Sequence, residues 1–398
     1  MNLKIGIVGL PNAGKSTLFN ALLKKSVADV APYPFCTIEP NVGVVPVPDV
    51  RLERLAEVTK EEEKMDKLPP LVPAIVEFVD IAGLVAGASK GEGLGNKFLS
   101  HIREVDLICH VVRNFVDPAV VHVAGEINPL RDKDIIETEL ILADLQTLEK
   151  QQEPFGYPQR KPQPGRSTKE DFERWDLILK LKTELDNGHS AREVITDEFE
   201  REMVRDLHLL SMKQVLFVMN VSESQLNDVS VISSDSEKSQ RDSSQKPRDD
   251  NFHVQNNTLI ICAKTEAELA SLTSIEQKEY LAALGVPVSG LDLLIQKAYQ
   301  MLGLISFLTT GVIESRAWTI VNGTKAPQAA GTIHTDFEKK FIKADCVSYT
   351  DFINPSGLAS PKPSEGGWKK SRELGKVRQE GKEYVMQDGD VVEFKIGA

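Results

Sequence analysis

Short apolar runs rich in β-branched residues alternate along the chain with helical or loop-like segments. Five runs have the length and residue types of buried strands, and the segments between them show helical spacing or clusters of Gly and Pro. This alternation is typical of a parallel sheet covered by helices on both faces. We therefore predict an α/β fold built on a doubly wound sheet. The five runs are residues 3–8, 74–79, 107–112, 214–220 and 258–263.

A long charged insertion separates the third run from the fourth. Apolar residues recur at helical spacing on both sides of a Pro- and Gly-rich break over residues 153–166. Two helices joined by such a break predict an antiparallel helical (coiled-coil) arm, over residues 130–210, that projects from the sheet and serves contacts. The apolar positions are Ile135, Ile136, Leu140, Ile141, Leu142, Leu145 and Leu148 before the break, and Phe172, Trp175, Ile178, Leu179 and Leu185 after it.

The residue composition and the predicted elements change twice more toward the C-terminus. Residues 222–257 contain nine serines and many charges, so they bury too little apolar surface to offset ordering entropy, and we expect a mobile loop there. From about residue 306, short β-like runs alternate with Gly-rich turns and predict a small α+β module. The predicted domains are therefore residues 1–303, interrupted by the arm, and residues 304–398.

Composition limits the class of protein. The 398 residues are 41% hydrophobic, enough for the cores of two or three domains. Neither a zinc ribbon nor a disulfide framework is indicated, because the cysteines form no C-x-x-C pair. No apolar stretch approaches the roughly 18 residues of a membrane span, and the chain opens with a strand-like run. We expect a cytoplasmic protein with no membrane partner. The four cysteines are Cys36, Cys109, Cys262 and Cys346.

The net charge of −12 argues against broad coating of nucleic acid, and no DNA partner is expected. The charge is uneven, since residues 361–382 contain seven Lys or Arg against three Glu. A solvated charged face and a contact with RNA are both compatible with this stretch.

The most specific motif is G-L-P-N-A-G-K-S at residues 9–16, which matches G-x-x-x-x-G-K-[ST]. Gly9 and Gly14 allow a tight turn in which backbone N–H groups and a helix N-terminus face anionic oxygens. Lys15 is expected to reach the β- and γ-phosphates, and the Ser16 hydroxyl to ligate Mg²⁺. The strand before the motif and the helical spacing after it complete the context of a P-loop nucleotide-binding domain. The predicted phosphate-binding residues are Asn12, Ala13, Gly14, Lys15, Ser16 and Thr17.

Two further residues complete a predicted Mg²⁺ site. Asp80 opens the sequence D-I-A-G directly after a strand-like run, where nucleotide switches place an Asp in the Mg²⁺ shell. Thr37 lies in a Pro-rich loop between the two motifs and could close onto the metal and the γ-phosphate. Leu84 stands where many GTPases have the Gln that orients water. Hydrolysis is therefore expected to be very slow or to use a side chain from elsewhere.

Base recognition is predicted to differ from that of common GTPases. Their N-K-x-D motif is replaced by N-V-S-E at residues 220–223, so Glu223 stands where an Asp accepts hydrogen bonds from guanine. This change is expected to weaken guanine preference and to give an ATP-preferring or dual-specificity pocket. Asn220 could still bond the base edge, and the loop C-A-K supports the base through its backbone. The predicted base-site residues are Asn220, Val221, Glu223, Cys262 and Ala263.

Taken together, these motifs closely resemble those of the Obg-like ATPase family, in its YchF branch, over nearly the whole chain. The matching segments include P-F-C-T-I-E-P-N at residues 34–41, the Gly-rich stretch 80–98 and residues 316–345. The resemblance implies a translation-factor-class P-loop ATPase with an inserted helical arm and a C-terminal TGS domain. Such a protein binds the ribosome, with the large subunit as the expected partner and RNA contact through the TGS domain as a further one.

The resemblance also implies two roles that the residues alone do not indicate. His122 matches the catalytic histidine proposed for the family, and Asn12 matches a P-loop asparagine that allows the use of K⁺. The Pro-rich break in the arm and the Ser-rich loop at residues 222–257 depart from the family pattern. These departures affect the expected arm length and the contacts around the base, while the phosphate motifs follow the pattern.

Three functions remain in competition at this point. The first is an ATP-hydrolysing switch in which Lys15 and His122 are catalytic. The second is an Obg-type GTPase of ribosome assembly, and the third is a non-hydrolysing protein whose nucleotide sets the shape of its binding surfaces.

Overall fold

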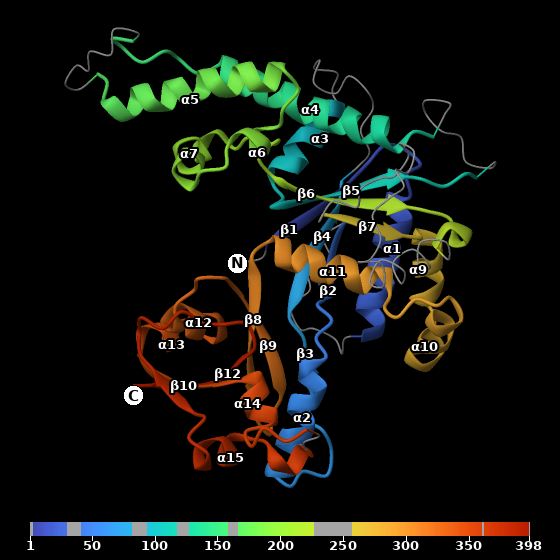
Figure 1. Ribbon diagram of the computed structural model, residues 1–398, viewed down its shortest axis with the longest axis vertical. Coiled ribbons are helices and arrows are strands. Elements are labelled where there is room, and N and C mark those ends of the chain that lie inside the picture. The colour runs from blue at the N-terminus through green and yellow to red at the C-terminus, as the bar shows by residue number, and fades with distance from the viewer. Residues whose placement is uncertain are drawn as a thin grey trace, which may run out of the picture. The chain divides into compact units, whose positions relative to one another are not determined.

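The computed structural model describes residues 3–29, 41–81, 94–117, 127–157, 166–226, 257–359 and 362–397. They group into two compact units (Figure 1). Unit 1 consists of the described residues within 1–25, 37–43 and 77–291, and unit 2 of those within 26–36, 44–76 and 292–398. Neither unit is a single continuous stretch of chain.

The first sheet confirms the predicted α/β architecture. Its strand order is β2-β4-β1-β5-β6-β7, and β1 lies parallel to both β4 and β5. All five runs predicted as strands are strands, whereas β2 was not predicted. The strands are β1 (Lys4–Val8), β2 (Val42–Pro46), β4 (Ile75–Asp80), β5 (Leu107–Arg113), β6 (Gln214–Asn220) and β7 (Thr258–Ile261).

Helices cover both faces of this sheet. On one face, α3 (Leu94–Arg103) and the first half of α4 (Pro129–Glu149) bury apolar side chains against β1, β5 and β6. Helix α1 (Lys15–Asp29) and helix α9 (Ala263–Leu269) lie on the other side (Figure 1). Helix α10 (Ser274–Ala283) follows α9. Of the expected loop at residues 222–257, the part from 227 to 256 lies outside the described residues.

Helices α4 and α5 (Lys169–Asp186) lie side by side as a helical hairpin (Figure 1). Each has a strong start, because Asn128 caps α4 ahead of Pro129 and Thr168 forms a capping box with Asp171 in α5. The second half of α4 and the length of α5 share an apolar core with the short elements α6 (Ala191–Val194), α7 (Glu198–Met203) and η2 (Arg205–Leu207).

A buried carboxylate joins this hairpin to the sheet. Asp144 on α4 is fully buried and accepts hydrogen bonds from the N–H groups of Leu210 and Ser211, both at 2.7 Å, and from the Ser211 hydroxyl at 2.6 Å. These residues lead directly into β6. The side chain therefore fixes the point where the chain returns from the hairpin to the sheet.

The second sheet has the strand order β11-β10-β12-β8-β9-β3 and lies in unit 2. Its apolar face packs on α12 (Ala326–Ile333), whose buried alanines allow a close approach. The strands are β3 (Leu71–Val72), β8 (Leu304–Thr310), β9 (Ser315–Val321), β10 (Phe341–Ser348), β11 (Arg378–Glu380) and β12 (Asp390–Ile396). The other helices of this region are α11 (Gly290–Met301), α13 (Thr335–Lys339), α14 (Tyr349–Ile353), η3 (Pro363–Glu365) and α15 (Trp368–Glu373).

Residues 44–76 belong to unit 2, although they lie in sequence within the predicted domain 1–303. Helix α2 (Arg51–Glu62) is held there at both ends. Arg51 pairs with Asp388 at 2.7 Å, and the Glu62 carboxylate accepts the N–H groups of Trp368 at 3.0 Å and Lys369 at 2.6 Å. This difference arises from contacts between residues some 300 positions apart, which a reading of contiguous segments does not reveal.

No helix in the described ranges combines the length and the apolar character that crossing a membrane requires.

The Asp144 anchor gives a stability prediction. In Asp144→Asn, an amide N–H₂ replaces one acceptor oxygen and faces backbone donors, so we expect the free energy of local opening to fall by about 3 kcal/mol. Hydrogen exchange of the Leu210 and Ser211 amides would measure it. The matched control is Asp134→Asn, an exposed position on the same helix. Unchanged protection in Asp144→Asn would show that the three hydrogen bonds do not stabilise the junction.

Candidate nucleotide-binding site

The phosphate-binding loop runs from the end of β1 to the start of α1 and is packed closely on its neighbours. Gly14 adopts φ +98°, and a Cβ at this position would collide with the Asn220 side-chain nitrogen. A Cβ at Gly9 would collide with the Val111 carbonyl oxygen. Asn12 is also left-handed, with φ +64°, a conformation that Asn tolerates better than most residues. Both glycines of the motif are therefore required by close approach of backbone or side chain.

The loop presents several backbone donors. Helix α1 begins at Lys15, so the first N–H groups of the helix have no partner within it. The Ala13 N–H instead donates to the Leu10 carbonyl at 3.3 Å, which closes the loop on itself. Ser16 and Thr17 are exposed at the helix N-terminus. The structure thus brings the predicted phosphate-binding residues together at one positive helix end.

Lys15 and Asp80 form the charged centre of the site. Lys15 is 8% exposed, and its Nζ donates to the Leu10 carbonyl at 2.9 Å. Burial lowers the pKa of Lys15, and the Asp80 carboxylate partly offsets this. Burial likewise raises the pKa of Asp80, against Lys15 and a hydrogen bond from the Ser16 hydroxyl. Both shifts disfavour the charged forms, as expected where a charged ligand would balance them.

Asp80 and Ser16, two of the three predicted Mg²⁺ ligands, are therefore neighbours. Within the described residues, the buried Oδ1 of Asp80 has no hydrogen-bond partner. The backbone N–H of Asp80 donates to the Asn41 carbonyl at 2.9 Å. This hydrogen bond ties the end of β4 to the residue that precedes β2. The third predicted ligand, Thr37, lies outside the described residues, as do Leu84 and the predicted catalytic His122.

The Asn220 side chain bridges two loops. Its Nδ2 donates to the Ala13 carbonyl at 2.9 Å, and its Oδ1 accepts the Ala263 N–H at 3.0 Å. The residue is 4% exposed. Both ends of the amide therefore bind backbone, so its main structural role is to hold the phosphate loop against the start of α9. The sequence motif locates Asn220, but the bridge depends on contacts with residues more than 40 positions away.

The remaining predicted base-site residues differ in exposure. Val221 is buried, and its N–H donates to the Ile261 carbonyl at 2.9 Å. Glu223 is exposed. Cys262 is buried and directly precedes α9, whose first residue is Ala263. Glu223 is thus the one of these side chains that is open to a ligand.

Two polar residues on β5 were missed in the sequence analysis because they sit inside an apolar run. His110 is buried beside Val8, the residue before the loop, and burial lowers its pKa to about 3. It is therefore neutral at physiological pH. Arg113 is buried at the end of β5, opposite Asn220, and its Nε donates to the Phe115 carbonyl at 3.2 Å.

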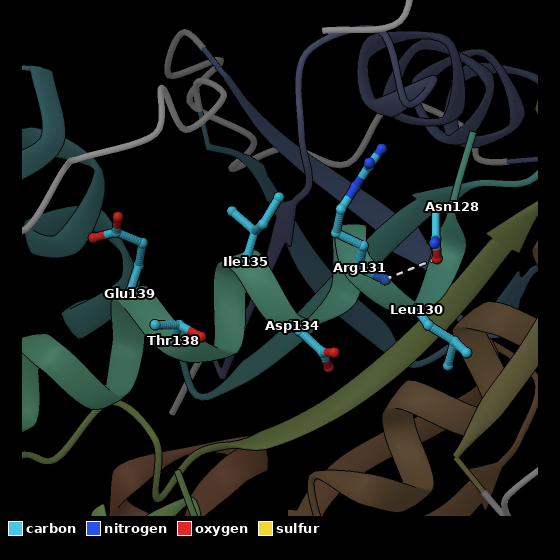
Figure 2. Close-up of a pocket in the computed structure, with 7 residues that line it drawn as sticks. All are labelled: Asn128, Leu130, Arg131, Asp134, Ile135, Thr138 and Glu139. Atoms are coloured by element: carbon cyan, nitrogen blue, oxygen red, sulfur yellow. Dashed lines mark hydrogen bonds between the residues drawn. The ribbon is translucent and has the colours of Figure 1, made fainter. Parts of the chain in front are cut away.

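A separate cavity of about 560 Å³ lies at the start of α4 (Figure 2). Arg131, Ile135 and Glu139 project to one side of the helix in this view, and Leu130 and Asp134 to the other. The hydrogen bond drawn there, from the Arg131 N–H to Asn128 Oδ1 at 3.1 Å, is the helix cap. None of the lining residues is a predicted site residue, so this cavity is not part of the phosphate site.

Comparison with known proteins matches an N-terminal and a C-terminal part of the chain to families. Residues 4–152 match the family described as "50S ribosome-binding GTPase", and residues 304–397 match the YchF-GTPase C-terminal family, described as a protein of unknown function.

Full-length relatives are similar as well. The chain is 45% identical to the ribosome-binding ATPase YchF of Bacillus subtilis, with all of both chains covered, and 42% identical to that of Escherichia coli O157:H7, with 99% of each covered. Among solved structures, it is similar to the YchF GTPase of Schizosaccharomyces pombe, with TM-score 0.79, 35% identity, and coverage of 99% of this chain and 98% of that one.

The Asn220 bridge gives a prediction for the site. Asn220→Ala leaves the Ala13 carbonyl and the buried Ala263 N–H without partners, so we expect the free energy of unfolding of unit 1 to fall by about 2 to 4 kcal/mol. Pulse proteolysis across a urea series would measure it. Asn187→Ala, an exposed position at the end of α5, is the control. Equal stability of the two variants would contradict the proposed bridge.

Proposed function

The chain belongs to the YchF family, and we propose that it is a ribosome-associated ATPase that binds ATP and slowly hydrolyses it to ADP and phosphate. In this proposal the nucleotide acts as a switch for binding surfaces elsewhere on the protein, and GTP binds more weakly than ATP. The observation that supports it most is the buried Lys15 at the start of α1, with the half-buried Asp80 carboxylate beside it. That arrangement places a cation for phosphate and an anion for metal at one site, from the start of α1 and the end of β4.

The phosphates are held mainly by the backbone of the loop. The N–H groups of residues 12–17 and the N-terminus of α1 surround the anionic oxygens, and Lys15 neutralises charge on the β- and γ-phosphates. Binding replaces the Lys15 contact with the Leu10 carbonyl, which is the bond that the side chain makes without ligand. Lys15 is catalytic in this scheme because negative charge grows on the leaving β-phosphate oxygens as the terminal bond breaks.

Mg²⁺ fits the residues present. The Ser16 hydroxyl and the Oδ1 of Asp80, which has no hydrogen-bond partner among the residues that the structure describes, are hard oxygen donors of the kind that Mg²⁺ prefers. Thr37 is proposed as the third protein ligand. Held there by Ser16, Thr37 and Asp80, Mg²⁺ would neutralise negative charge on the phosphates. The described residues contain no cluster of three His, Cys, Asp or Glu that could hold a metal alone, consistent with a metal held largely by phosphate and water. K⁺ beside Asn12 is proposed as a further charge.

His122 is proposed to position or activate the attacking water. This assignment comes from the resemblance to the family and from the Leu84 that replaces the usual Gln. His110 does not take this place, because it is buried and strongly resists protonation.

ATP preference is assigned to the base site around Asn220, Val221 and Glu223, with Cys262 and Ala263 behind it. With the Asn220 amide engaged by backbone at both ends, discrimination falls mainly to the exposed Glu223. A carboxylate can accept a hydrogen bond from the adenine amino group. An Obg-type GTPase of ribosome assembly, or a non-hydrolysing nucleotide-gated protein, would be the alternative if these contacts favoured guanine or if no phosphate were released.

The ribosome is the proposed partner, because curated relatives are named ribosome-binding ATPases and the N-terminal family is described as binding the 50S ribosome. We assign the helical hairpin as a contact arm and residues 304–398 as a TGS domain that touches RNA. A cytoplasmic location follows from such a partner.

Calorimetric titration with ADP and with GDP tests the nucleotide assignment. We expect tighter binding of ADP, and Lys15→Ala is expected to weaken ADP binding at least tenfold because a buried cation at the phosphates is lost. Lys24→Ala, an exposed lysine on the same helix, is the control. Preference for GDP would favour the GTPase alternative, while undiminished affinity in Lys15→Ala would contradict the phosphate site itself.

His122→Ala tests the chemistry separately from binding. Steady-state phosphate release is expected to fall about 100-fold or more, since general acid–base or water-positioning groups contribute roughly that much, while ADP affinity stays the same. His101→Ala, an exposed histidine on α3, is the control. Unchanged turnover in His122→Ala would refute the assigned role, and absence of turnover in the native protein with ribosomes and K⁺ would favour the non-hydrolysing alternative.

A further inference from the structure

The tip of the helical hairpin is positively charged in an otherwise acidic chain. Residues 150–169 contain five Lys or Arg and one Glu, whereas the whole chain has net charge −12. In the described part of this segment the cations are Lys150, Arg166 and Lys169, all exposed and none in an ion pair. We call residues 150–157 and 166–169 the hairpin tip; it lies at the end of the pair where α5 begins (Figure 1).

An exposed aromatic ring sits among these charges. Phe155 is 50% exposed, and the Arg166 guanidinium lies over its ring, 5.0 Å from the centroid. An aromatic face backed by a guanidinium plane is the arrangement on which nucleobases stack in single-stranded RNA. A hydrophobic protein partner would not need the cation over the ring, so the pair favours a ligand with both flat bases and negative charge.

The ring is held in place by the fold. The Ser167 hydroxyl donates to the Phe155 carbonyl at 2.7 Å, across the two sides of the tip. Tyr157 anchors the other side, because its hydroxyl donates to Asp176 at 3.1 Å and its ring packs edge-on against Trp175. A turn with Gly156 at φ +87° lies between these anchors, and the Phe155 ring remains half exposed. The platform is thus formed before a ligand binds.

The C-terminal basic stretch at residues 361–382 provides a contrast. Four of its seven cations form ion pairs, Lys370 with Glu373, Arg372 with Glu393, Lys376 with Asp351 and Arg378 with Asp390. The charge of these four cations is therefore largely balanced within the domain, and each contributes less to attraction of phosphate than an unpaired cation does. The hairpin tip keeps its charge available.

We propose that the hairpin tip is a binding site for single-stranded RNA, in which Phe155 and Arg166 stack on a base while Lys150 and Lys169 contact phosphates. The site deepens the proposed ribosome association by naming an RNA-contacting residue set, and it rests on that function only for its biological setting. Helix α4 has 21 residues and so separates the tip from its own N-terminus by about 30 Å. None of the tip residues is a predicted nucleotide-site residue, so nucleotide binding and RNA binding can be tested apart.

The test uses the full-length protein and a fluorescein-labelled 12-nucleotide oligouridylate RNA, with binding followed by anisotropy over a KCl series. Phe155→Ala is expected to weaken binding about fivefold or more, the range found for loss of one stacked base. Phe199→Ala is the matched control, because Phe199 is 63% exposed on α7 between Glu198 and Glu200. Circular dichroism of both variants verifies that the hairpin is folded.

Lys169→Glu separates charge from stacking, because the exposed Lys169 contacts phosphate in this proposal and does not stack on a base. It is expected to weaken binding and to reduce the slope of log affinity against log salt by about 0.7, the value for one lost contact with a single strand. The control is Arg205→Glu, because Arg205 lies in the same unit but already forms an ion pair with Glu202.

Equal RNA affinity for Phe155→Ala and Phe199→Ala would overturn the proposal. So would displacement of the RNA by an equal concentration of polyglutamate, which would indicate an acidic protein partner, or equal binding of an RNA duplex, which cannot stack on the ring. ATP turnover measured without RNA keeps the two functions distinct. If ATP turnover is intact and no RNA binds, only the proposed RNA site at the hairpin tip is contradicted. If RNA binds and no ATP is hydrolysed, only the proposed ATPase function is contradicted.

Discussion

The geometry of the site depends on how the phosphate loop is held from outside. A loop that turns around glycines has little intrinsic preference for one shape, because glycine loses the most conformational freedom when it is ordered. Here the Val111 carbonyl closes one side at Gly9, and the Asn220 amide closes the other at Gly14 while it binds the Ala13 carbonyl. Strands β5 and β6 thus fix the conformation of the phosphate loop, which β1 and α1 alone would not determine.

The same constraint explains which parts of the site could be predicted from the sequence. Gly9, Gly14, Lys15 and Ser16 are close in the chain, so their spacing already encodes the cradle, and the strand and helix around them follow from local patterns. The Asn220 bridge, the Asn41 contact to Asp80 and the polar His110 inside β5 depend on pairing between distant strands. A reading of local periodicity has no access to such pairing, and it treated β5 as uniformly apolar.

The distribution of charged residues along the sequence is a similarly limited guide to binding surfaces. The C-terminal stretch and the hairpin tip look alike as runs of basic residues, but only the structure reveals partners such as Glu393 for Arg372 and Asp390 for Arg378. A cation next to a carboxylate is largely neutral to a distant phosphate, whereas one beside an aromatic ring keeps its field. Net charge along a sequence is therefore a poor guide to where an anionic partner binds until ion pairs are known.

The placement of residues 44–76 in unit 2 has a consequence for how the protein is made. Helix α2 is translated early and buries Leu52, Leu55 and Val58, yet most of the elements that it contacts, β8, β9, α14 and η3, come from the last part of the chain. During synthesis the apolar side of this amphipathic helix is therefore exposed to solvent until the residues from 304 onward have been made. A nascent chain in that state exposes an aggregation-prone apolar surface. A chain that ended before residue 304 would expose this surface permanently.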